Sequence, residues 1–91
     1  MTIQYLTARV NLGTVDLLGK VFELQWLSAG GTDTVTVDVR GLQPSRVGTV
    51  VGLEEGGSPR LVIVEPMYTY LRDQHGPEII AAVRTACQAR P

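Results

Sequence analysis

The only cysteine and the only histidine of the chain, Cys87 and His75, are the residues best suited to nucleophilic catalysis. A reactive thiol needs a neighbouring base that holds it as a thiolate, so a catalytic pair requires the two side chains in contact. Cys87 falls among apolar residues at helical spacing, where cysteine usually behaves as a small buried hydrophobe. A structural role is the favoured interpretation, and the sequence predicts no enzyme.

The acidic residues indicate neither a metal site nor a two-carboxylate hydrolase. Asp73 and His75 offer two metal ligands, but no third follows at helical or hairpin spacing, and zinc and iron sites need three or four. Glu54 and Glu55 are adjacent, so in a strand they point to opposite faces. The glycine-containing segment 52–57 lacks the Lys-Ser/Thr ending of a phosphate loop. We therefore expect no cofactor and no metal.

Three arginines that flank predicted turns, Arg40, Arg46 and Arg60, are candidate anion-binding residues. If they converged at one end of a sheet, they would suit phosphate groups or acidic side chains. Arginines at strand ends more often form a solvated rim. A formal charge of −1 also disfavours a nucleic-acid-coating protein, which needs clustered Lys and Arg. A small nucleic-acid-binding barrel that uses this arginine patch is the alternative function.

Two tyrosines, Tyr68 and Tyr70, are the candidate partner-binding aromatics. On a helix they lie about 200° apart, so a single buried stripe cannot hold both. At least one ring is expected to be exposed or at a helix–sheet edge, and exposed tyrosine is enriched at protein interfaces. Packing in the core is an equally good interpretation for either ring taken alone.

The composition is that of one ordinary globular domain spanning residues 1–91. The chain is 44% hydrophobic and 19% charged, so it has enough apolar residues to form a core. A single cysteine excludes an intramolecular disulfide framework. No run approaches the ~20 apolar residues of a membrane span, and the first residues lack the apolar core of a signal peptide. The cytoplasm is the expected compartment.

Residues 1–65 are predicted to form short β-strands separated by Gly-rich turns. Apolar and polar residues alternate most regularly in segment 33–40, which predicts one buried and one solvent-facing side. This strand should form an antiparallel hairpin with segment 20–28, whose large apolar residues share one face. The expected strands are 2–10, 20–28, 33–40, 47–53 and 60–65.

The turns and glycines between these strands lead to three further expectations. Segment 11–19 is interpreted as a connection, although its apolar residues 15–18 also suit a short inward turn or an extension of a neighbouring strand. Gly48 and Gly52 predict a bulge, strong coiling or close approach of another backbone. The uninterrupted apolar run 61–64 predicts a central strand.

Residues 66–91 are predicted to form two helices. The first covers residues 67–75, because Gly76 suits the position after a helix and Pro77 the first position of the next. In the second helix an apolar stripe should pack on the sheet: Ile79, Ile80, Val83, Ala86 and Cys87. The predicted fold class is α+β, with a four- to five-stranded, mostly antiparallel, curved or barrel-like sheet followed by two C-terminal helices. A five-stranded barrel with a C-terminal helix is the main alternative.

The predicted function is a small soluble protein-binding module, an inhibitor or adaptor that acts by occluding a partner protein. Small inhibitors of phages and mobile elements resemble it in general type only. The candidate partner-binding residues are Tyr68, Tyr70, Arg40, Arg46 and Arg60. Self-association to a homodimer is also expected, because segment 33–40 presents Thr34 and Thr36 without a protecting Lys or Pro.

Overall fold

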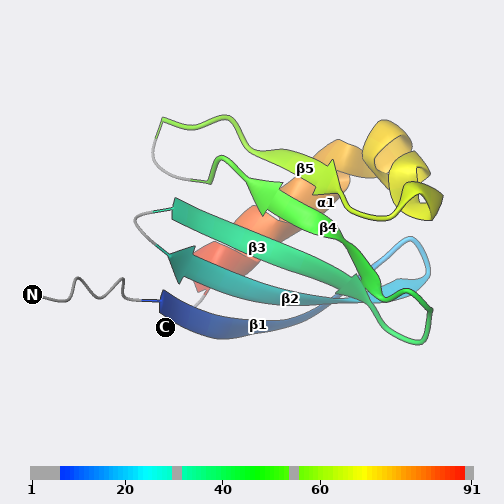
Figure 1. Ribbon diagram of the computed structural model, residues 1–91, viewed down its shortest axis with the longest axis horizontal. Helices are drawn as coiled ribbons and strands as arrows, with labels where there is room; N and C mark the ends of the chain where they lie inside the picture. Colours follow the sequence, from blue (N-terminus) through cyan, green and yellow to red (C-terminus); the bar gives the residue numbers. More distant parts are fainter. Residues whose placement is uncertain (1–6, 30–31, 54–55, 90–91) are drawn as a thin grey trace, which may run out of the picture.

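The computed structural model describes residues 7–29, 32–53 and 56–89, which form one antiparallel sheet followed by one helix (Figure 1). The elements are β1 (Thr7–Leu17), β2 (Lys20–Ala29), β3 (Thr32–Val39), β4 (Arg46–Val51), β5 (Arg60–Ile63), the 3₁₀ turn η1 (Pro66–Tyr68) and α1 (Thr69–Ala89). The strands lie in the order β1-β2-β3-β4-β5. Because β1 and β5 are the two edges, the sheet is open. This confirms the small α+β fold with an antiparallel sheet, and the barrel alternative is wrong.

The predicted hairpin of β2 and β3 is confirmed. Leu24 lies opposite Val37 and Trp26 opposite Val35, so the large apolar residues of both strands face the same side of the sheet. Cross-strand pairs of this kind stabilise a sheet because their side chains pack against each other. Of these, Leu24 and both valines are at most 1% exposed.

β1 continues past the predicted strand end at residue 10 to Leu17. The interpretation of segment 11–19 as a connection is therefore wrong, and the alternative that this segment extends a strand is confirmed. A β-bulge at Leu12 interrupts the regular alternation, and the side chain of Asn11 accepts a hydrogen bond from Gly13 N at 2.8 Å within it. Leu18 and Gly19 then form a two-residue turn with φ of 57° and 71°. The part of the predicted first strand in residues 2–6 lies outside the described residues.

The positions of β3 and β5 in the sheet are the reverse of those expected. β3 is the central strand and pairs with both β2 and β4, so the predicted self-association through an exposed β3 edge loses its basis. β5, expected to be central, is an edge strand. Gly48 confirms the predicted close approach of another backbone, because a Cβ there would overlap the carbonyl oxygen of Val62.

The prediction of two helices is wrong, since α1 continues through Gly76 and Pro77. Proline disfavours a helical residue before it mainly through a clash with that residue's Cβ, and Gly76 has none. The missing N–H of Pro77 leaves the carbonyl of Asp73 without its helical donor. Asp73 lies on the exposed side of the helix, where solvent can replace that donor.

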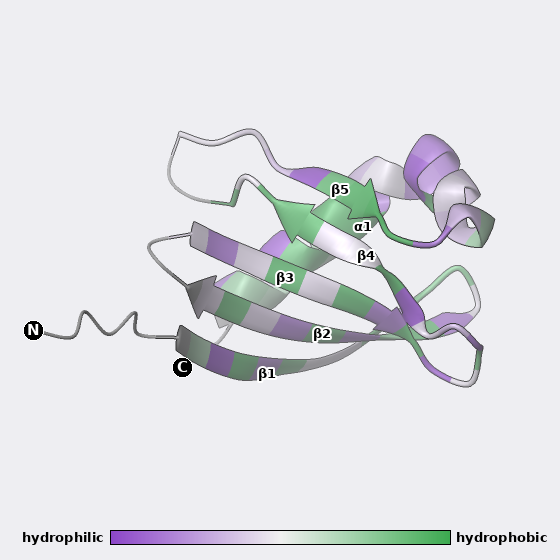
Figure 2. Ribbon diagram, viewed as in Figure 1, coloured by the Kyte–Doolittle hydropathy of each residue, from purple (hydrophilic) through white to green (hydrophobic). Residues whose placement is uncertain are grey.

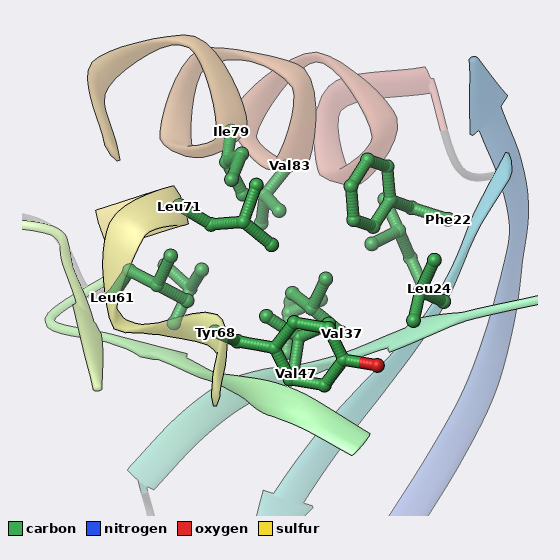
Figure 3. Close-up of a cluster of buried hydrophobic side chains, with 12 residues drawn as sticks. Phe22, Leu24, Val37, Val47, Leu61, Tyr68, Leu71, Ile79 and Val83 are labelled. Carbon is green, nitrogen blue, oxygen red and sulfur yellow. The ribbon is translucent and has the colours of Figure 1, made fainter. Parts of the chain in front are cut away.

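The core lies between α1 and one face of the sheet (Figure 3). Ile79 and Val83 are at most 2% exposed, which confirms the predicted apolar stripe, and the half-buried Cys87 packs at its end. Tyr68 and Leu71, from η1 and the first turn of α1, close the core at one end. The described residues bury no polar or charged side chain, so the contact between the helix and the sheet is mainly apolar packing.

Candidate functional site

The face of the sheet opposite α1 is covered by none of the described elements, and we call it the open face (Figure 1). Residues that alternate with the core residues project from it. In Figure 2 the strands accordingly alternate between purple and green along their length. From β1 to β5, its central rows hold Arg9, Asn11, Glu23, Gln25, Leu27, Thr34, Thr36, Asp38, Arg46, Thr49, Val51, Arg60 and Val62.

Two ion pairs neutralise the charges at one end of the open face. Glu23 and Asp38 lie directly opposite each other on β2 and β3, an arrangement that is repulsive between like charges. Arg40 Nε lies 3.0 Å from Glu23 Oε1, and Arg46 Nε lies 2.5 Å from Asp38 Oδ1. Both pairs are solvent-exposed, so each contributes at most ~1 kcal/mol to stability. These arginines already have carboxylate partners.

The three arginines considered as one possible patch do not converge, in keeping with the favoured interpretation of a solvated rim. Arg46 begins β4, whereas Arg60 pairs with Val51 at the other end of that strand. Because this separation is five residues of extended chain, the Cα atoms of Arg46 and Arg60 lie roughly 17 Å apart. The nucleic-acid alternative therefore loses the convergent patch on which it rested.

A small pocket of about 150 Å³ lies on the open face. Its lining combines two arginines with an amide, a hydroxyl and an apolar side chain: Arg9, Gln25, Leu27, Thr36 and Arg46. Sequence reasoning missed Arg9, because the first strand was expected to end at the next residue, Val10, and its pairing with β2 was not specified. With the observed register, Arg9 lies opposite Leu27 on the same face as Gln25.

Four exposed apolar side chains follow one another from β5 through η1 into α1, and we call them the apolar strip. They are Val62, Val64, Met67 and Tyr70, with 44%, 55%, 51% and 42% of their surface exposed. Among the described residues, the other large exposed apolar side chains are Leu18, in the β1–β2 turn, and Leu42, in the β3–β4 loop. Sequence reasoning found only Tyr70, since the run that contains Val62 and Val64 has the pattern of a buried strand.

Tyr68 belongs to the core and is not presented to a partner. It is 1% exposed, and its hydroxyl donates a hydrogen bond to the carbonyl of Pro44 at 2.7 Å. Burial raises the pKa of Tyr68, and the nearby charges of Tyr70 and Glu65 raise it further. The expectation that at least one tyrosine is exposed is met by Tyr70 alone.

The residues considered for catalysis and metal binding lie apart. Cys87 and His75 are twelve residues apart on one continuous helix, which separates them by roughly 18 Å along its axis. His75 Nδ1 instead lies 3.3 Å from Glu78 Oε1, one turn away on the exposed side. In the part of the chain that the structure describes, no three His, Cys, Asp or Glu side chains are grouped as metal ligands.

No protein-family model matches this chain, and neither the curated proteins nor the solved structures include a significant match to it. Among the described residues, no helix combines the length and the apolar character needed to cross a membrane. The functional assignment therefore rests on the geometry of the open face and the apolar strip.

Proposed function

We propose that this protein is a small protein-binding module that contacts its partner through the apolar strip. The observation that carries the proposal is the exposure of four large apolar side chains in one stretch of nine residues, each 42–55% exposed. Exposed apolar side chains grouped along one segment are costly in water, and where they form a patch they commonly mark an interface. Removing apolar surface from water is favourable by about 25 cal/mol per Å², before the entropy cost of association is subtracted.

The backbone beside the strip supports a protein partner over a small molecule. β5 pairs on one side only, with β4, so its outer edge offers backbone donors and acceptors to another chain. An extended segment that adds to such an edge gains backbone hydrogen bonds, and neighbouring side chains provide specificity. Val62 on β5 and Val64, which directly follows the strand, are the exposed apolar residues placed to supply those side-chain contacts.

Occlusion is the mode of action that fits such a surface. A sheet backed by a packed helix is a rigid platform, so little ordering entropy opposes binding. A module of this kind inhibits or adapts a partner by covering part of its surface.

Affinity capture from the native host tests the proposal with two matched variants. Tyr70→Ala removes an apolar side chain that is 42% exposed within the strip, and Leu42→Ala removes one that is 40% exposed in the β3–β4 loop. We expect wild type and Leu42→Ala to retain the same protein, and Tyr70→Ala to lose most of it, as interface tyrosines often contribute ~1–2 kcal/mol or more.

Equal retention by both variants would contradict the role of the strip. Capture of nucleic acid with no protein, in a form that weakens steeply as salt rises, would favour the nucleic-acid alternative instead.

A further inference from the structure

We propose that the pocket formed by Arg9, Gln25, Leu27, Thr36 and Arg46 is a receptor for one carboxylate, carried by an Asp or Glu side chain of the partner. This inference rests on the proposed protein-binding function. It adds to that function a specific polar contact on the open face, formed by residues of β1 to β4.

The sheet register brings two guanidinium groups to one small cavity. Arg9 projects from β1 and Arg46 from β4, while Gln25 and Thr36 form a cross-strand pair between them on β2 and β3. Both arginines line the same space of about 150 Å³. Guanidinium groups bind carboxylates through paired, charge-assisted hydrogen bonds, and two of them lining one cavity favour an anion there.

The donors of the pocket are still available to a ligand. Arg9 has no ion-pair or hydrogen-bond partner among the described residues, and neither has the side-chain amide of Gln25. Arg46 uses Nε for Asp38, so its terminal nitrogens retain four N–H groups. The hydroxyl of Thr36 donates to the backbone carbonyl of Gln25 at 3.4 Å. An entering anion thus meets three sets of donors, on the side chains of Arg9, Gln25 and Arg46.

Charge and size favour a carboxylate over a phosphate group. Asp38 and Glu23 lie beside the pocket and offset two of the three nearby arginines, Arg9, Arg40 and Arg46. A single residual positive charge matches a monoanion better than a dianion. The cavity is also well below the ~300 Å³ of ordinary small-molecule sites, so it fits one acidic side chain, with its methylene groups against Leu27.

The test uses small probes, so it is independent of the partner. Nitrogen-15 NMR follows the side-chain amide of Gln25 and the Nε–H signals of Arg9 and Arg46 during titration with N-acetylglutamate α-methylamide. The uncharged glutamine analogue and methyl phosphate are titrated in parallel. Arg9→Gln is compared with Arg60→Gln, which removes another exposed arginine on the same face, at the β5 edge.

We expect saturable shifts of all three groups with the glutamate probe, no saturable shift with the glutamine analogue, and weaker binding of methyl phosphate. Arg9→Gln should weaken glutamate binding about tenfold, and Arg60→Gln should leave it unchanged. Absence of saturation, an equal effect of the two variants, or tighter binding of methyl phosphate would each overturn the proposal. If the pocket fails while capture still depends on Tyr70, the protein-binding function stands without it.

Discussion

Tyr68 shows how one side chain joins three parts of this fold. Its ring fills the end of the core below α1, and its hydroxyl reaches the β3–β4 loop at Pro44. Sequence reasoning left the choice between core and interface open for Tyr68 and Tyr70, because their helical spacing of about 200° shows only that one stripe cannot bury both. The 3₁₀ turn decides it, since it aims Tyr68 inward and leaves Tyr70 exposed.

Tyr68→Phe is expected to lower the free energy of unfolding by ~1–2 kcal/mol. The substitution keeps the ring but removes the donor to a partly buried carbonyl, which then lacks its partner. Denaturant titration measures the change. Tyr70→Phe is the matched control and should change stability little, and an equal loss in both variants would contradict the assigned hydrogen bond.

The dependence of the unfolding free energy on alkaline pH provides a second test of Tyr68. The pKa of Tyr68 is raised in the folded state, so above pH ~10 the unfolded chain loses the phenol proton first and the folded protein loses stability. The stability that the protonated phenol of Tyr68 contributes is fully present below pH ~10. Tyr68→Phe should therefore show a shallower alkaline fall in unfolding free energy than wild type.

The strands and the helix differ in how far the sequence determines them. β2, β3 and the stripe of α1 were predicted because side-chain alternation and helical spacing are uninterrupted there. β1 was misplaced because the bulge at Leu12 breaks its alternation and because Leu18 adopts a positive φ uncommon outside glycine. The predicted break between two helices was wrong because Gly76 lacks the Cβ with which Pro77 would normally clash.

Val83→Ala tests the packing of α1 on the sheet. Val83 is fully buried against the core, so losing two methyl groups should cost roughly 0.5–2.5 kcal/mol of unfolding free energy. Thr85→Ala, on the exposed side of the same helix turn, should be close to neutral because alanine is the better helix former. Thermal or denaturant unfolding of both variants checks the difference, and an unchanged midpoint for Val83→Ala would contradict the packing.

At the scale of the whole molecule, one face of the sheet packs against α1 in the core, and none of the described elements covers the other. The sequence predicted the polar alternation that makes this division, but it could not show which apolar residues lie at an edge. Val62 appears buried by pattern and is exposed because it projects from the open face, which none of the described elements covers. Homodimer formation stays a prediction, and the edge available for it is β1 or β5, since β3 is paired on both sides.

The most direct test of the proposed interface is site-specific photo-crosslinking in the native host. A photoreactive amino acid replaces Tyr70 in the apolar strip or, as a control, the exposed Gln88 near the end of α1. We expect a single covalent adduct with another protein from position 70 and none from position 88. No adduct from position 70, or equal adducts from both positions, would contradict a protein interface centred on the apolar strip.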